Sequence, residues 1–153
     1  MHLFNREAHV ERFTAKKAFQ HYIEGSGDPV RAPFDQLNTA GVLPTDFQEV
    51  RDSIILGPGG YSIDGRLTYT ESGENFAVFG DVTLRLQGTL QVQEGGWKFR
   101  GTLKAFDDLY DFNPSTHRSF MGELSTAVGR YTPGTPYWIE IRGSRRIYSG
   151  GGR

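Results

Sequence analysis

Two carboxylates, a phenol, an imidazole and a guanidinium fall within eleven positions of this 153-residue chain. They belong to Asp108, Tyr110, Asp111, His117 and Arg118. Paired carboxylates can hold a divalent cation, the imidazole can move a proton near neutral pH, and the guanidinium can neutralise phosphate charge. Cleavage of a phosphate ester needs these functions together. The set therefore favours a site for phosphate-ester hydrolysis.

The segment at positions 112–116, Phe-Asn-Pro-Ser-Thr, predicts a turn that leads into a helix. Asp108 and Asp111 are three residues apart, so one turn would aim both carboxylates at one point. Two carboxylates would repel a phosphate unless a cation lay between them, so we expect Mg²⁺ as the cofactor and both residues as its ligands. The same residue types also occur in ordinary surface loops, so the composition alone leaves a non-catalytic loop open.

The pattern Asp-x-Tyr-Asp-x5-His-Arg resembles the signature of the colicin M family, bacteriocins that degrade lipid II, and no position inside it departs from the family's pattern. Residues 19–29 also resemble the segment that opens the family's toxic domain. The resemblance implies that Asp111 is the central catalytic carboxylate and that Asn113 supports substrate binding. The family's essential residues fall here on Asp108, Tyr110, Asp111, His117 and Arg118, which we call the signature residues.

The resemblance also implies a substrate and a setting. Family members hydrolyse lipid II between the undecaprenyl chain and the pyrophosphate, which stops peptidoglycan synthesis. We therefore expect a toxin that is made in the cytoplasm, is released, and acts in the periplasm of a target bacterium. It would meet lipid II at the membrane surface as a monomer, and an immunity protein would protect the producer. The resemblance covers residues 10–148, so we expect one catalytic domain over 1–153, with receptor-binding and translocation domains absent.

The bulk composition excludes several other classes of function. The net charge is −1 and the isoelectric point about 6.4, so the chain has no overall basic field for nucleic acid. No apolar run approaches the twenty residues of a membrane-spanning helix. The absence of cysteine excludes disulfides, thiolate metal sites and cysteine nucleophiles. The sequence contains no His-x-x-His spacing, so it gives no indication of a zinc site.

Hydrophobic periodicity predicts an α+β fold in which a curved antiparallel sheet, a partial barrel, is flanked by a few α-helices. Helical spacing marks residues 10–24 and 116–128, and a further helix is expected from Thr45, with Thr45 and Gln48 as a capping box. Alternation marks strands around 61–69, 82–92, 97–103 and 137–141, with a hairpin at Glu94-Gly95-Gly96. We expect a turn at 71–75, an irregular loop at 28–44, frayed residues at 149–153, and the carboxylates on a loop at the end of the sheet.

Two other functions stay open at this point. One is a general Mg²⁺-dependent phosphoesterase that acts on a soluble substrate. The other is a non-enzymatic lectin-like or lipocalin-like domain, in which Trp97, Trp138 and several tyrosines would line a ligand groove.

Overall fold

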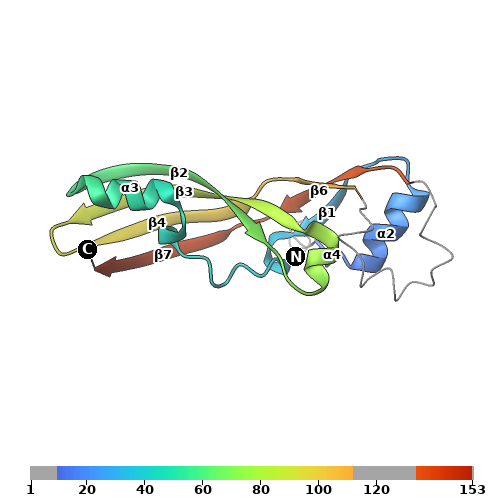
Figure 1. Cartoon of the computed structure of the whole chain (residues 1–153), viewed down its shortest axis with the longest axis horizontal. Coiled ribbons are helices and arrows are strands. Elements are labelled where there is room, and N and C mark those ends of the chain that lie inside the picture. The colour runs from blue at the N-terminus through green and yellow to red at the C-terminus, as the bar shows by residue number, and fades with distance from the viewer. Residues whose placement is uncertain (1–9, 112–133, 153) are drawn as a thin grey trace, which may run out of the picture.

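The chain folds around two β-sheets that follow one another along an elongated molecule (Figure 1). The computed structural model describes residues 10–111 and 134–152. The large sheet has the strand order β2-β3-β4-β7, and the small sheet has the order β1-β6-β5. The strands are β1 (Val30–Pro33), β2 (Gly59–Thr70), β3 (Asp81–Gln93), β4 (Gly96–Ala105), β5 (Asp108–Tyr110), β6 (Tyr137–Arg142) and β7 (Arg145–Gly152). The helices are α2 (Ala15–Glu24), α3 (Gln48–Leu56) and α4 (Glu74–Phe79), with 3₁₀ turns η1 (Phe34–Gln36) and η2 (Pro44–Asp46).

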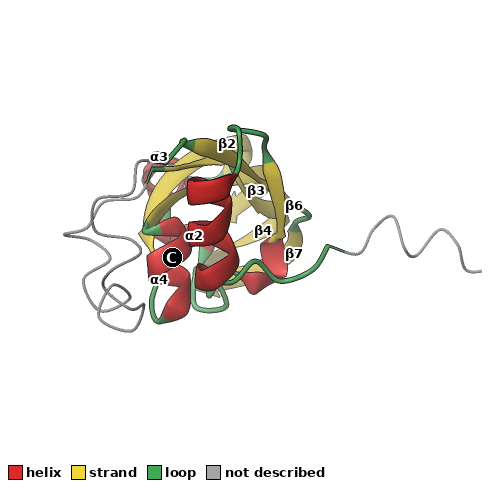
Figure 2. Cartoon of the chain, turned by 90° about the vertical axis from the view of Figure 1, so that its right-hand side faces the viewer, coloured by secondary structure: helices red, strands yellow, loops and turns green. Residues whose placement is uncertain are grey.

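The predicted α+β class is confirmed, and the sheets are curved without closing into a barrel (Figure 2). The large sheet is antiparallel throughout, and the predicted hairpin joins β3 to β4, where Gln93 pairs with Gly96. The parallel pair of β1 with β6 was not predicted. Residues 28–44 were expected to be an irregular loop, but they contain β1 and η1. β1 has only four residues, ends in a proline and depends on a distant partner, so no local pattern revealed it.

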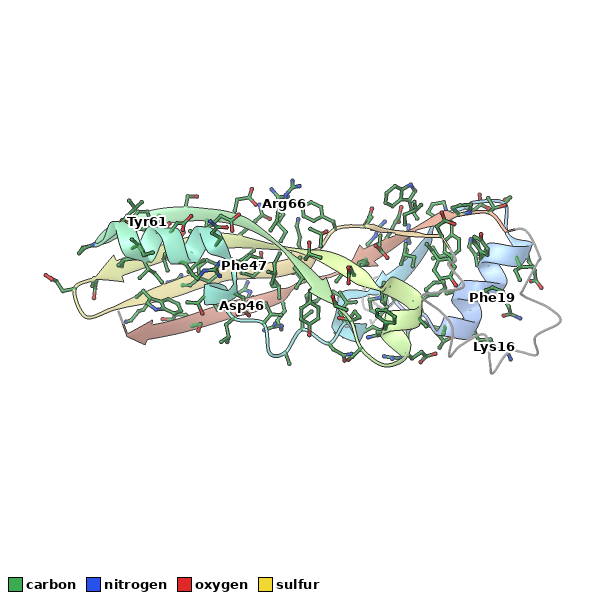
Figure 3. All side chains as sticks on the ribbon, viewed as in Figure 1. Lys16, Phe19, Asp46, Phe47, Tyr61 and Arg66 are labelled. Atoms are coloured by element: carbon green, nitrogen blue, oxygen red, sulfur yellow. The ribbon has the colours of Figure 1, made fainter. Side chains whose placement is uncertain are left out.

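One face of the large sheet is dry, as the alternation predicts. Leu84, Leu86 and Leu90 on β3 are fully buried. Phe47 and Val50, at the start of α3, are also fully buried and belong to the same hydrophobic cluster. The Phe47 ring packs on β2, 3.2 Å from the place a Cβ on Gly65 would occupy, whereas Arg66 on β2 points away from the body of the molecule (Figure 3).

A glycine pair accounts for the close approach of β3 and β4. Gly88 pairs with Gly101, and a Cβ on Gly88 would lie 2.2 Å from the carbonyl oxygen of Arg100. The ring of Phe99 lies over both glycines, at 2.8 and 2.7 Å from the places their Cβ atoms would occupy. The pair therefore leaves the space that this buried ring fills.

Two helix starts differ from the predictions. The first helix begins at Ala15 rather than at position 10, because Thr14 caps it by accepting a hydrogen bond from the Lys17 N–H. The capping box at Thr45 is wrong, since Thr45 lies inside η2 and α3 begins only at Gln48. The Asp46 carboxylate accepts the Leu43 N–H at 2.8 Å instead.

Two turn-like segments proved to be regular structure. The turn predicted at 71–75 extends directly into α4, which the hydrophobic spacing did not reveal in so short a helix. The C-terminal residues 149–152, expected to be frayed, complete β7 and pair with β4. Their glycines pass close to β4, where the Gly150 Cβ position lies 2.9 Å from the Trp97 carbonyl oxygen. The helix predicted at 116–128 lies outside the described residues.

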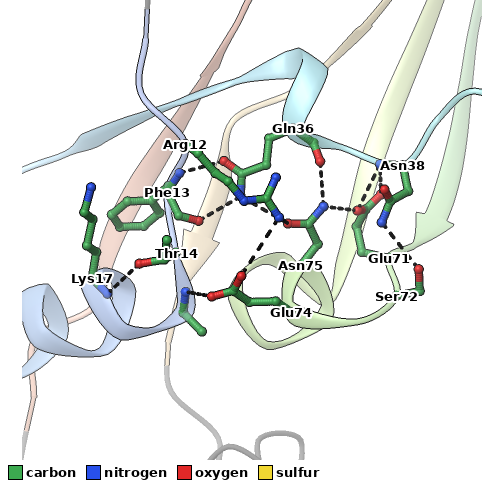
Figure 4. A network of polar contacts seen from close by, with 11 residues as sticks. Arg12, Phe13, Thr14, Lys17, Gln36, Asn38, Glu71, Ser72, Glu74 and Asn75 are labelled. Carbon is green, nitrogen blue, oxygen red and sulfur yellow. Dashed lines mark hydrogen bonds and ion pairs between the residues drawn. The ribbon is translucent and has the colours of Figure 1, made fainter.

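A buried polar network joins the N-terminal segment to η1 and α4 (Figure 4). The Gln36 side chain accepts the Phe13 N–H and donates to the Phe13 carbonyl, both at 2.7 Å. The Asn75 amide donates to the Gln36 carbonyl at 2.7 Å and to the Glu71 carboxylate at 2.8 Å. The two bonds with Gln36 use both backbone groups of Phe13, so this residue does not extend the first helix. No helix in the described part of the chain is long and apolar enough to cross a membrane.

Candidate functional site

The first half of the signature forms a strand. Asp108, Leu109 and Tyr110 make β5 and pair antiparallel with β6, so that Asp108 faces Ile139 and Tyr110 faces Tyr137. The prediction that these carboxylates sit on a loop is therefore wrong for Asp108 and right only for Asp111, the residue after the strand. The partner strand lies beyond position 136, so a local pattern in the sequence could not reveal it.

Tyr110 lies in a cluster of aromatic rings. Its side chain is buried and stacks on Tyr137 with ring centroids 5.1 Å apart. Tyr22 of α2 meets it edge-on at 5.7 Å, and the Tyr137 hydroxyl donates to the Ala18 carbonyl at 2.6 Å. Burial, followed by the proximity of Tyr22, raises the pKa of Tyr110 far above its ordinary value. The phenol is therefore neutral at physiological pH and can act as a hydrogen-bond donor.

Asp108 is the described carboxylate best suited to proton transfer. Its side chain is half-buried on the strand face that it shares with Tyr110. Burial and, to a smaller extent, the Asp81 carboxylate together raise the pKa of Asp108 to about 7, although the hydrogen bond from the Leu109 N–H opposes the shift. A carboxyl group with this pKa exchanges a proton near neutrality. The residue pattern assigned this capacity to His117 alone.

Asp111 is exposed and lies at the base of the segment that carries the remaining signature residues. Burial and then the Asp111 carboxylate raise the pKa of Tyr22. On the far side of the segment, the Thr135 N–H donates to the Tyr22 carbonyl at 2.8 Å. A Cβ on Gly134 would lie 2.2 Å from the Tyr22 ring. Tyr22 therefore contacts a described residue on each side of positions 112–133, Tyr110 before them and Thr135 after them, while Asn113, His117 and Arg118 themselves lie outside the described residues.

The positions of Asp108 and Asp111 bear on the predicted Mg²⁺ site. Three residues of extended strand span about 10 Å, and successive side chains alternate between faces. Asp108 and Asp111 are thus not brought together by a single turn, as the spacing suggested. Across 10–111 and 134–152, no three acidic or histidine side chains converge in a group that could hold a metal ion. Asp108 and its neighbour Asp81 offer oxygen donors of the kind Mg²⁺ takes, and the cofactor stays a prediction.

Four residues of this region were not singled out as site residues. Tyr22 and Tyr137 pack against Tyr110, and Asp81 acts on Asp108. His21 is half-buried, with its ring 4.4 Å from that of Tyr137 and its Nε2–H donating to the Asp28 carbonyl at 2.7 Å. Only the occurrence of His21 and Tyr22 in the family-like segment 19–29 could have pointed to them.

Comparisons with known proteins agree with the signature. The family model described as Colicin M matches residues 4–153. Colicin-M of Escherichia coli is 30% identical over 141 residues, which cover 89% of this chain and 52% of that protein.

Solved structures of bacteriocins are also similar to this chain. A truncated bacteriocin syringacin M from Pseudomonas syringae pv. tomato DC3000 has a TM-score of 0.75 at 33% identity, covering 90% of this chain and 59% of that one. PaeM, a colicin M-like bacteriocin produced by Pseudomonas aeruginosa, has a TM-score of 0.74 at 32% identity, covering 92% and 51%. The chain thus spans a little over half the length of these relatives. The chain belongs to the colicin M family.

Proposed function

We propose that this protein is an antibacterial hydrolase that cleaves lipid II between the undecaprenyl chain and the pyrophosphate. Water supplies the new O–H groups, so the products are undecaprenol and the pyrophosphorylated sugar-peptide. Membership of the colicin M family and the intact signature support the proposal.

One observation carries the chemistry. Asp108 lies on a rigid strand, half-buried, with a pKa of about 7, and the neutral phenol of Tyr110 shares its face. A carboxyl group of this kind can protonate the oxygen that leaves with the prenyl chain, because it holds its proton at neutral pH and can release it. The Tyr110 hydroxyl would orient that carboxyl group or a phosphate oxygen.

The other signature residues take complementary roles in the proposal. Asp111, exposed beside Tyr22, is the central carboxylate and would help to hold Mg²⁺, as Asp108 would once deprotonated. The cation would offset the charge on the phosphoryl oxygens. His117 would activate the attacking water, Arg118 would bind phosphate oxygens through its planar guanidinium, and Asn113 would support substrate binding.

The prenyl part of the substrate has an apolar surface close by. Leu109 and Trp138 face each other across β5 and β6 and are 47% and 53% exposed. Leu109 lies on the strand face opposite Asp108. An exposed leucine–tryptophan pair suits the interface between lipid tails and headgroups. Phe112, next to Asp111, is a further candidate for lipid contact and lies outside the described residues.

The setting follows from the substrate. The protein would act as a monomer in the periplasm of a target bacterium after release from its producer, which would carry an immunity protein. Hydrolysis would halt peptidoglycan synthesis. A general phosphoesterase would instead prefer soluble phosphate esters over prenyl pyrophosphates, and competition between the two substrate classes separates the readings.

Replacement of Asp111 by alanine tests the assignment. The side chain is exposed and follows the strand, so Asp111→Ala should keep the fold and abolish lipid II hydrolysis. The matched control is Asp52→Ala, an exposed aspartate on α3, which should hydrolyse lipid II at the wild-type rate. Wild-type turnover by a folded Asp111→Ala protein would refute the assignment.

A further inference from the structure

The outer face of the large sheet carries an unusual concentration of positive charge. Strand pairing brings Arg66, Arg85 and Lys104 into one row across β2, β3 and β4. The next rows on the same face add further cations from β4 and β7. The basic face, as we call it, comprises Arg66, Arg85, Lys98, Arg100, Lys104 and Arg146.

Few carboxylates compensate this charge. In the described strands the same face carries two carboxylates, Asp64 and Asp81, so six cations against two carboxylates leave a formal charge of +4 there on a chain whose net charge is −1. Among the residues that the structure describes, Arg85 alone of the six forms an ion pair, with Asp64 at 2.8 Å. The other five are exposed. Such a face attracts an anionic partner.

Aromatic side chains accompany the cations. The Arg66 guanidinium lies 4.7 Å from the ring centroid of Phe106, and that of Arg85 lies 5.8 Å from it. Arg100 lies 5.9 Å from the ring of Tyr148, which is 76% exposed. Lys98, Arg100 and Tyr148 also border a hollow of about 410 Å³. Cations combined with exposed aromatic rings suit the headgroup layer of a membrane.

The basic face is continuous with the candidate active site. The Phe106 N–H donates to the Thr83 carbonyl at 2.9 Å, which prolongs the pairing of β4 with β3 beyond Lys104. Two residues further on, Asp108 lies near Asp81, at the start of β3. The chain therefore leads from the cations at the end of β4, past Phe106, to Asp108 on β5 of the small sheet, and Asp81 at the start of β3 lies close enough to Asp108 to raise its pKa.

We propose that the basic face docks the enzyme on an anionic phospholipid surface and so presents Asp108 to a substrate held in that surface. The inference rests on the proposed function, because that function puts the substrate in a bilayer. A face that extends over four strands fits an extended layer of phosphates. An acidic protein is the competing occupant, and the experiment below distinguishes the two.

The test measures binding of the full chain to vesicles of phosphatidylcholine with and without 30% phosphatidylglycerol, by flotation and without lipid II. The wild type should bind the anionic vesicles, and more weakly as salt rises. The test variant replaces three exposed cations that have no ion pair in the described structure: Lys98→Gln, Arg100→Gln and Arg146→Gln. Its affinity should fall on the order of a hundredfold, since each surface cation contributes roughly fivefold.

The control variant loses the same three positive charges, but from α2 and α3 instead of the basic face: Lys16→Gln, Lys17→Gln and Arg51→Gln. Lys16 lies on α2, towards the other end of the molecule from α3 (Figure 3). This control should bind vesicles like the wild type. Equal losses in both variants, or equal wild-type binding to neutral vesicles, would overturn the proposal. Retention on soluble polyglutamate without vesicle binding would also overturn it and would indicate an acidic protein partner.

Hydrolysis of lipid II in detergent micelles separates this inference from the proposed function. The test variant should cleave micellar lipid II at the wild-type rate, because none of its three changes touches a signature residue. Vesicle binding without any hydrolysis by the wild type would refute the function and keep the docking face. Hydrolysis without vesicle binding would refute the docking face alone.

Discussion

Replacement of Asp108 by asparagine is expected to stabilise the protein at alkaline pH and to leave its stability almost unchanged in acid. Burial, together with the nearby Asp81 carboxylate, raises the pKa of Asp108 from an ordinary 3.8 to about 7, so the folded protein holds this proton more tightly than the unfolded chain does. Below pH 3.8 the group is protonated in both states and costs nothing. As the pH rises from 3.8 towards 7, the unfolded chain releases this proton before the folded state does, so stability falls steadily and levels off once the folded state is also ionised.

The pKa difference sets the size of the effect. At about 1.4 kcal/mol per pKa unit, it corresponds to roughly 4 kcal/mol lost between acid and alkaline pH. This is an upper limit, because Asp108 keeps some contact with water, which screens its charge. Asparagine is nearly the same size and carries no charge. We therefore expect Asp108→Asn to gain about 2–4 kcal/mol over the wild type at pH 8.5 and less than about 0.5 kcal/mol at pH 4.

The assay is urea unfolding followed by circular dichroism at pH 4, 5.5, 7 and 8.5, with EDTA present so that no cation stabilises the carboxylate. Asp111→Asn is the matched control, and since its side chain is exposed it should show no such gain. Asp108→Asn should lose lipid II hydrolysis while it gains stability at alkaline pH. A constant stability difference at all four pH values, or a loss of stability at pH 8.5, would refute the proposed environment of Asp108.

Three further predictions address the network, the cofactor and the lipid. Asn75→Leu should lower the free energy of unfolding by about 2–4 kcal/mol, because it leaves the Gln36 carbonyl and the Glu71 carboxylate without their buried donor; a urea midpoint equal to the wild type's would contradict this. Exhaustive chelation should abolish lipid II hydrolysis, and Mg²⁺ should restore it better than Zn²⁺; full turnover in EDTA would show that Arg118 and backbone donors suffice. Phe112→Ser should raise the Michaelis constant for long-tailed lipid II but not for a short-chain analogue, and equal losses on both would exclude a role in lipid contact.

The long strands could be predicted from the sequence because their pattern is local. Val82, Leu84 and Leu86 alternate with polar residues whichever strands pair with β3. The short elements could not be predicted in this way. β1 and β5 have four and three residues, and both are defined by pairing with β6 more than 25 residues further along the chain. The glycine-rich end at 149–152 likewise becomes a strand only beside β4.

The candidate site, too, could be predicted from the sequence only in part. The residue types at Asp108, Tyr110 and Asp111 could be read directly, and the resemblance to the colicin M family gave them their meaning. The environment of these side chains could not be predicted from the sequence, since the pKa of Asp108 depends on burial and on Asp81, which lies 27 positions earlier. The burial of Tyr110 likewise depends on rings from α2 and β6.

Incubation of the purified protein with lipid II and Mg²⁺, followed by identification of the products by mass spectrometry, tests the central claim most directly. We expect undecaprenol and the intact pyrophosphorylated sugar-peptide, because the proposed cleavage separates the prenyl carbon chain from the pyrophosphate. A reaction in ¹⁸O-labelled water will show which product takes up the water oxygen. Undecaprenyl phosphate or undecaprenyl pyrophosphate as the lipid product, or unchanged lipid II, would contradict the proposed function.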